Sequence, residues 1–402
     1  MLQRTLQFDP AADADFFLAI PAAPAVFILR GSTENAEPYV SKSANLRRRL
    51  HRLLGRPEEN SKRLNLRNQV RSIEYELTGS DFESGFVLYR AWRAEFPKTY
   101  SNRLRLRLPP MLKFIFDNPY PRVSVTTRIG SLRGNAKYYG PFPTRVLAEK
   151  FANDSLDFFK MRRCTDDLHP DPAFPGCIYS EMKMCLAPCF KGCTDSDYHA
   201  EVDRVRTYFD SAGHSLVREI EAARDHASET LDFEAAAAAH ARVEKAKSVT
   251  RELPEIVRRI DQLDALMIQQ SSQPESVTLF RIAAGIICEP VQFHISAQTE
   301  STDKPLSMER RILDTLEPVP AVEPSSALEW MEHLALLKRW YYRTARTGEI
   351  FLAENGELPL RRIVRGVSRI FKGEKPQPDL NEAAREYWIL RGKEAEQQPG
   401  SE

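Results

Sequence analysis

Residues 21–54 read PAAPAVFILRGSTENAEPYVSKSANLRRRLHRLL, and this stretch indicates an α/β fold. The apolar run AVFILR predicts a strand, the polar residues after Gly31 predict a turn, and a second strand begins near Pro38. Four leucines then recur at the spacing of one buried helical face: Leu46, Leu50, Leu53 and Leu54. A strand hairpin followed at once by an amphipathic helix is therefore the expected core of the first domain.

The rest of the chain changes composition at several points, and each change marks an expected domain boundary. A loop-rich stretch carries most of the cysteines, and an alanine-rich, charged stretch carries apolar residues at helical spacing. The expected fold class is α/β (α+β) and multidomain. Its parts are a first domain at 20–110, a linker and cysteine-rich module at 111–200, a helical hairpin at 210–255, a small α/β domain at 275–372 and a disordered tail at 391–402.

The composition excludes several classes of protein. With 402 residues, 42% of them hydrophobic, the chain can form several domains that each bury a core. No stretch approaches the ~18 uninterrupted apolar residues of a membrane span, and the N-terminus is acidic where a signal peptide would be basic. We therefore expect a cytoplasmic protein with no membrane contact. Because the net charge is only +1, any nucleic-acid surface must come from local clustering of Lys and Arg.

Five of the six cysteines fall within thirty residues, as metal ligands do in a reducing compartment. Twelve residues separate Cys164 from Cys177, seven separate Cys177 from Cys185, and three separate Cys185 from Cys189. Only the last pair resembles a zinc knuckle, so the spacing leans away from zinc, although four thiolates suit both an iron–sulfur cluster and an all-cysteine zinc site. The spacing therefore predicts a metal centre on these four cysteines, which leans toward a 4Fe–4S cluster and leaves zinc as the alternative.

Basic residues cluster in two places. Residues 41–71 carry ten Lys or Arg against two Glu, and the segment NRLRLRL at 102–108 alternates arginine and leucine, which on a strand places the arginines on one face. Such clusters give salt-dependent affinity for a phosphate backbone without base specificity, whereas the alternative is a merely solvated charged surface. The expected DNA-binding residues are Lys42, Arg47, Arg48, Arg49, Arg52, Arg103, Arg105 and Arg107.

Several motifs within roughly residues 20–255 resemble one known family. They are IPAAPAVF with PYVSKSANLRRRL, FIFDNPYPRVSV with YYGPFP, the tripeptides RRC, PGC, KMC and APC, and LDFEAAAAAHARVE. All resemble the N-terminal part of the UvrC family, the incision subunit of bacterial nucleotide excision repair. The resemblance implies a GIY-YIG nuclease-like domain, an iron–sulfur cluster on the four cysteines, and a UVR hairpin that contacts a UvrB-like partner. The implied partner-binding residues are Leu231, Phe233, Glu234, Ala236 and Val243.

The nuclease motif of that family matches only in part. Tyr39, Lys42 and Arg49 fall at the positions of its second tyrosine, its lysine and its arginine. Phe27 replaces the first tyrosine, and Leu88 replaces the metal-binding glutamate. Phenylalanine cannot transfer a proton, and leucine cannot hold the Mg²⁺ or Mn²⁺ that neutralises charge on the reacting phosphate. We therefore expect a degenerate catalytic site whose remaining polar residues hold phosphate.

Two nearby glutamates and the C-terminal part complete these expectations. Glu83 is out of helix phase with the lost ligand, whereas Glu95 could rescue a metal site. Neither the RNase H-type nuclease nor the helix-hairpin-helix modules of the family's C-terminal half is visible, and residues 275–372 resemble the segment that leads into that nuclease. The expected function is a UvrC-like protein that binds DNA and a UvrB-type partner. The alternative is an active Mg²⁺- or Mn²⁺-dependent endonuclease that makes a single incision in damaged DNA.

Overall fold

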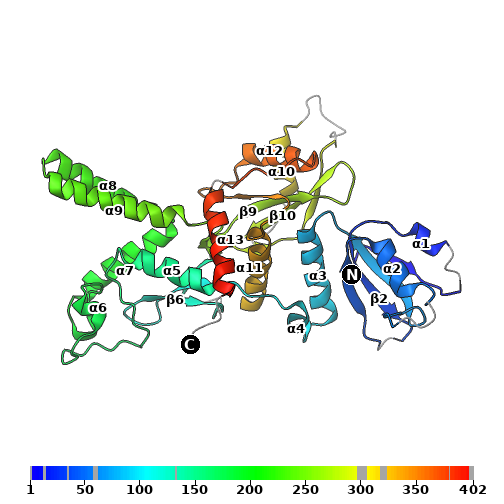
Figure 1. The fold of residues 1–402 in the computed structure, drawn as a ribbon, viewed down its shortest axis with the longest axis horizontal. Coiled ribbons are helices and arrows are strands. Elements are labelled where there is room, and N and C mark those ends of the chain that lie inside the picture. The colour runs from blue at the N-terminus through cyan, green and yellow to red at the C-terminus, as the bar shows by residue number, and fades with distance from the viewer. Residues whose placement is uncertain are drawn as a thin grey trace.

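The computed structural model describes residues 2–11, 15–33, 36–57, 62–131, 134–296, 306–316, 324–379 and 381–397. They form an elongated molecule with an N-terminal sheet at one end and a helical hairpin, α8 (His214–Glu229) and α9 (Phe233–Arg251), at the other (Figure 1). Three antiparallel sheets alternate with helices, which confirms the mixed α/β multidomain class. None of the helices in these ranges combines the length and the apolar character that a membrane span requires.

The N-terminal sheet has strand order β1-β4-β2-β3. Its elements are β1 (Arg4–Gln7), α1 (Phe16–Ala19), β2 (Ala25–Gly31), β3 (Tyr39–Ser43), α2 (Leu46–Leu54), β4 (Val70–Leu77) and α3 (Asp81–Glu95). Alternate residues of β2 face opposite sides: Phe27 and Leu29 pack with the leucines of α2, whereas Val26 and Ile28 pack with α3. Both faces of the sheet are therefore covered by helices.

Helix α3 is shared between this sheet and the C-terminal part of the chain. Its Val87 packs against β2, whereas Phe82 and Phe86 on its other side make edge-on ring contacts with Phe280 at centroid distances of 5.0 and 6.0 Å. Because a sheet and a second domain cover opposite sides of one helix, α3 joins the two parts without a flexible linker.

The second sheet has strand order β6-β5-β7-β8 and brings together residues far apart in sequence. It follows α4 (Tyr100–Leu104) and consists of β5 (Met111–Ile115), β6 (Arg122–Thr126), β7 (Lys137–Gly140) and β8 (Arg258–Arg259). Helix α5 (Arg145–Leu156) packs on β5 and β6. The loops after α5 contain the cysteines and the elements α6 (Ile178–Glu181), the 3-10 turn η1 (Pro188–Phe190) and α7 (Asp195–Asp210).

The C-terminal sheet lies between the N-terminal sheet and the hairpin (Figure 1). After the 3-10 turn η2 (Ile260–Gln262) its strands are β9 (Ala265–Gln270), β10 (Ser276–Ala283), β11 (Ile286–Ile287), β12 (Val291–His294) and β13 (Glu349–Leu352). Its helices are α10 (Met308–Leu316), α11 (Ala327–Tyr341), α12 (Leu360–Phe371) and α13 (Glu382–Gln397). Leu266 and Ile268 of β9 pack with α10 and α12, whereas Ala265 and Met267 belong to the cluster that contains α11.

Two expectations about secondary structure are wrong. The segment NRLRLRL is not a strand, because α4 ends at Leu104, Arg105 has a left-handed φ of 47°, and no strand pairs with it among the described residues. Its leucines still face the core and its arginines still face solvent. The tail expected to be disordered from residue 391 is helical to Gln397, because Trp388 and Ile389 bury the apolar side of α13. Residues 398–402 lie outside the described residues.

Candidate metal centre and nuclease-like site

The four predicted metal ligands lie in the loops around α6 and η1. Cys164 follows the end of α5, Cys177 is the N-cap of α6, Cys185 lies between α6 and η1, and Cys189 is in η1. All four are half-buried free thiols. The backbone turns sharply around them, with left-handed φ angles at three non-glycine residues: Lys183, Ala187 and Lys191. Short loops of this kind bury little apolar surface of their own, so a bound metal centre would supply the missing stabilisation.

Hydrogen-bond donors point at two of the sulfurs. Nη1 of Arg162 donates to Sγ of Cys164 at 3.4 Å, and the N–H of Ala187 donates to Sγ of Cys185 at 3.3 Å. Arg162 is only 1% exposed, and its Nε donates to the carbonyl of Tyr120 at 2.8 Å. Such donors stabilise the negatively charged thiolate, which is the form that binds metal.

The electrostatics of the thiols favour a positively charged occupant. Burial and, to a smaller extent, the charges of Cys164, Cys189 and Cys177 raise the pKa of Cys185 to about 11, while the hydrogen bond from Ala187 opposes the rise. The thiols are thus close enough to disfavour each other's ionisation, and a cationic centre would reverse this. Among the described residues no three His, Cys, Asp or Glu side chains are grouped tightly enough for a single metal ion. Four thiols have the chemistry of a thiolate-ligated centre, and they are not gathered into such a ligand group in this structure.

The nuclease-like residues divide between the two faces of the N-terminal sheet. Nη2 of Arg49 on α2 donates to the hydroxyl of Tyr39 on β3 at 2.8 Å, and the buried ring of Phe27 lies 6.2 Å from the ring of Tyr39. Lys42 is on the opposite face, where its Nζ donates to Asp81 at 2.7 Å. The structure therefore brings Tyr39 and Arg49 together and separates Lys42 from them. The Nε of Arg49 is buried and has no hydrogen-bond partner among the described residues.

Among the residues that the structure describes, neither the predicted ligand position nor the two nearby glutamates supplies a free carboxylate beside Tyr39 and Arg49. Leu88 is half-buried on α3, on the other face of the sheet, beside the cluster that contains Val26 and Ile28. Both carboxylate oxygens of Glu95 accept hydrogen bonds from Arg30, at 2.7 and 3.0 Å. Glu83 is only 3% exposed, and the backbone N–H of Gly79 donates to it at 2.6 Å. Neither glutamate is free to replace the lost ligand.

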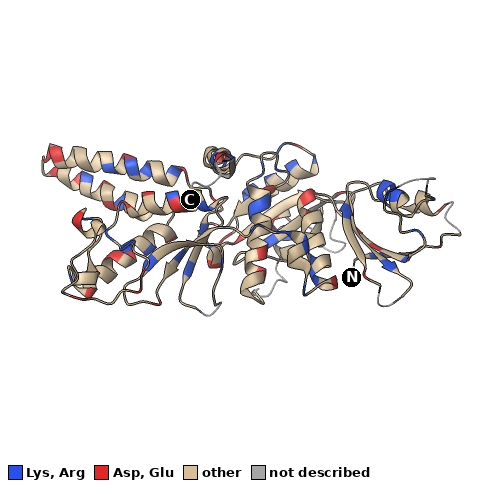
Figure 2. Cartoon of the chain, turned by 60° about the horizontal axis from the view of Figure 1, so that its bottom comes forward, with Lys and Arg blue, Asp and Glu red and all other residues tan. Residues whose placement is uncertain are grey.

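The predicted DNA-binding residues differ in their surroundings. Helix α2 carries basic residues without an acidic one, whereas both signs of charge are interspersed along the hairpin α8–α9 (Figure 2). Arg48 and Arg52 are exposed, but Arg47 donates to the carbonyls of Ile20 and Leu18 and so helps to anchor α2. Arg103 forms an ion pair with Glu37. Arg48 and Arg52 are therefore more accessible to a ligand than Arg47 and Arg103.

Arg105 and Arg107 lie at a cavity that the sequence did not reveal. Its lining includes three further basic residues from helices α11 and α13: Lys338, Arg339 and Lys393. In the sequence, Lys338 and Arg339 follow an apolar stretch and are typical of the end of an amphipathic helix. The only sequence signal was their basic character, because their position beside Arg105 depends on contacts between segments more than two hundred residues apart.

The tip of the hairpin exposes two apolar side chains. Leu231 is 71% exposed and Phe233 is 70% exposed, and both lie at the turn between α8 and α9. Glu234 is exposed and Ala236 half-buried nearby. Val243 is fully buried in the core, so its assignment to a partner surface is wrong for this conformation. The period of α9 turns Val243 toward α8 and away from the tip.

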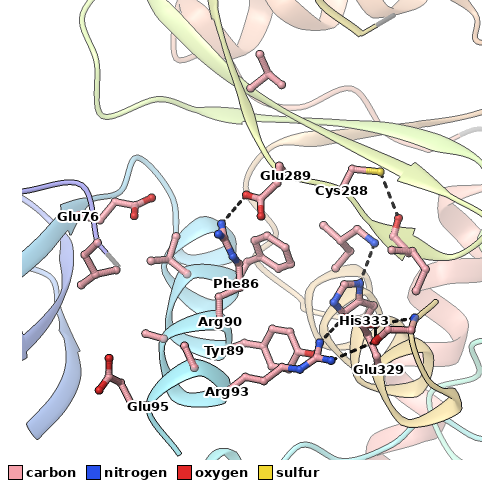
Figure 3. A pocket seen from close by; sticks show the side chains of 18 of the residues that line it. Glu76, Phe86, Tyr89, Arg90, Arg93, Glu95, Cys288, Glu289, Glu329 and His333 are labelled. Carbon is pink, nitrogen blue, oxygen red and sulfur yellow. Dashed lines mark hydrogen bonds and ion pairs between the residues drawn. The ribbon is translucent and has the colours of Figure 1, made fainter. Parts of the chain in front are cut away.

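A second cavity, of about 760 Å³, lies between α3 and the C-terminal domain. Figure 3 shows Arg90 reaching Glu289 and Arg93 reaching Glu329 across it. His333 on α11 is buried beside them, and this burial lowers its pKa to about 4. These ion pairs join α3 to the C-terminal domain, which explains the charged side chains without requiring a ligand.

The chain is similar to known proteins over most of its length. Residues 110–208 match the model of the UvrC/Cho excinuclease middle domain. The UvrABC system protein C of Methanothermobacter thermautotrophicus is 26% identical over 324 residues, which cover 78% of this chain and 54% of that protein. The protein of the same name from Actinobacillus pleuropneumoniae serotype 5b is 27% identical over 64% of this chain and 42% of its own length. The chain thus spans about half the length of the curated relatives it matches, and no solved structure gives a significant match.

Proposed function

Because the chain is related to UvrC proteins over most of its length, and residues 110–208 match their middle domain, we propose that it is a DNA-binding protein of nucleotide excision repair. In this proposal the N-terminal domain binds the phosphate backbone and does not cut it. The observation that carries the proposal is the site around Arg49. Its guanidinium contacts Tyr39, while Leu88 and two occupied glutamates leave no free metal-binding carboxylate there among the described residues.

The four cysteines would hold an iron–sulfur cluster. Cys164, Cys177, Cys185 and Cys189 supply the four thiolates, and the donors from Arg162 and Ala187 would stabilise the charge on two sulfurs. Such a cluster would fix the loops between the DNA-binding domain and the hairpin. Anaerobically purified protein should contain iron and sulfide in about equal amounts and absorb broadly in the visible range. Colourless protein that contains only zinc would refute the cluster.

The hairpin would bind a UvrB-type protein through its tip. Leu231 and Phe233 support this role, because exposed apolar side chains at the end of a projecting hairpin are free to insert into a partner. The partner would be held at the end of the molecule opposite the N-terminal sheet (Figure 1).

One experiment separates DNA binding from cleavage. Purified protein is mixed with damaged duplex DNA, a UvrB protein and Mn²⁺, and both binding and nicking are measured. We expect binding that weakens steeply with salt and no nick. A nick that Tyr39→Phe or Arg49→Ala abolishes would establish the alternative, an active endonuclease. Absence of DNA binding by the wild-type protein would refute the proposal itself.

A further inference from the structure

A cavity of about 440 Å³ lies where four distant parts of the chain meet. The loop after α4, the start of α5 and the helices α11 and α13 form its walls, and Figure 1 places α13 beside α5 and α11. Five basic residues line the cavity and none of its lining residues is acidic: Arg105, Arg107, Lys338, Arg339 and Lys393. From this charge and shape we propose that the cavity binds phosphate groups of a nucleic-acid strand. This inference rests on the proposed DNA-binding function.

Three of the five cations in this cavity lack a carboxylate partner among the described residues. Arg105, Arg339 and Lys393 form no ion pair with a carboxylate in the part of the chain that the structure describes, and Nζ of Lys393 instead donates to the hydroxyl of Thr344 at 3.2 Å. By contrast Arg103, two residues before Arg105, is paired with Glu37. Cations that line one hollow repel each other and create a positive potential, which an anionic ligand would relieve.

One further feature adds to the positive character of the cavity. Thr144 lines it and is the N-cap of α5, so the positive end of a twelve-residue helix dipole lies at its wall.

The walls favour a strand over a small anion. The basic residues come from three segments, and the lining between them includes apolar and aromatic surface from Leu106, Ile389 and Tyr342. A phosphodiester strand presents successive charges separated by less polar sugars, which suits such a mixed surface. A free phosphate or pyrophosphate shares the charge chemistry but would leave the apolar part of the wall uncovered.

The test compares two double variants of the full chain that lose the same charge. R339A/K393A removes two cavity cations, and R206A/K372A removes two cations from exposed ion pairs elsewhere. Binding of fluorescent DNA is measured by anisotropy over a range of salt concentrations. We expect R339A/K393A to lower affinity on the order of tenfold and to reduce the slope of log affinity against log salt by about two, because each phosphate contact contributes about 0.9 to that slope. R206A/K372A should match the wild type.

The outcomes distinguish this inference from the proposed function. Wild-type protein that does not bind DNA refutes the proposed function. DNA binding that is equal in the two double variants refutes only the role of the cavity. Inorganic pyrophosphate at micromolar concentration serves as the second probe. If it binds the wild type, and R339A/K393A loses that binding while its DNA affinity stays unchanged, the ligand is a free phosphate compound and the nucleic-acid assignment is wrong.

Discussion

Replacing Glu83 by glutamine should stabilise the protein relative to the wild type, and this gain in unfolding free energy should be larger at pH 8 than at pH 5. Glu83 is only 3% exposed at the start of α3, and burial, aided by the charge of Glu76, raises its pKa from 4.5 to about 7. The hydrogen bond from the N–H of Gly79 opposes this rise. A glutamine at this position keeps an oxygen that can accept that hydrogen bond and removes the charge.

The pH dependence of the unfolding free energy follows from the difference in the pKa of Glu83 between the folded and unfolded states. Because the pKa is raised in the folded state, the stability that Glu83 contributes is fully present below about pH 4.5 and is lost as the pH rises through about 7. A shift from 4.5 to about 7 corresponds to about 3 kcal/mol of unfolding free energy. Glu83→Gln should therefore gain roughly 2 to 3 kcal/mol more at pH 8 than at pH 5.

This difference is measured by urea unfolding at both pH values, with tryptophan fluorescence as the signal that reports unfolding. The exposed Glu357→Gln is the matched control, because it removes the same group from solvent and should change stability by less than about 0.5 kcal/mol at either pH. If Glu83→Gln and the control give the same pH dependence, the ionised carboxylate is not disfavoured by its surroundings and the reasoning fails.

Four further substitutions test other parts of the structure. Cys185→Ala should lower the bound iron per chain by half or more in an iron assay, and unchanged iron would contradict the cluster. Leu88→Glu should lower the melting temperature, because it introduces a carboxylate beside an apolar cluster, and should give no Mn²⁺-dependent nick, because position 88 lies on the face opposite Arg49; a gained nick would contradict that placement. Phe233→Ala should weaken UvrB binding roughly tenfold in surface plasmon resonance at an unchanged melting temperature, and equal affinity would exclude the tip. Tyr89→Phe removes a 2.9 Å hydrogen bond to the buried carboxylate of Glu332, so the unfolding free energy should fall by about 2 kcal/mol in urea titration, a loss that a merely structural ring would not produce.

Local patterns predicted the elements whose burial depends on short-range periodicity. The leucines of α2 are buried as their spacing indicates, and the mixed α/β class follows from the alternation of strand and helix signals. The cysteine spacing drew attention to the loops around α6, where charge interactions link the four thiols. These features were accessible because neighbouring residues in the sequence determine them.

The errors concern features that depend on distant contacts. The leucine–arginine alternation at 102–108 correctly indicated which side chains face solvent, but hydrogen bonding to a neighbouring strand is not encoded in that alternation. The polar composition after residue 390 suggested disorder. Instead α13 continues to Gln397, and the ring of Trp388 within this helix packs on the ring of Phe142 at a centroid distance of 5.3 Å. The position of Lys42 opposite Tyr39 follows from strand register, which places residues three apart on opposite faces. The basic cavity requires α11 and α13 to meet the loop after α4.

The double burial of α3 has a mechanical consequence. The N-terminal sheet packs on one side of this helix and Phe280 packs on the other. The sheet therefore cannot rotate relative to the C-terminal domain unless one of the two apolar contacts separates. Packing therefore helps to fix the distance between α2 at one end of the molecule and the hairpin tip at the other. A macromolecule bound at one end would therefore lie at a defined distance from whatever is bound at the other end.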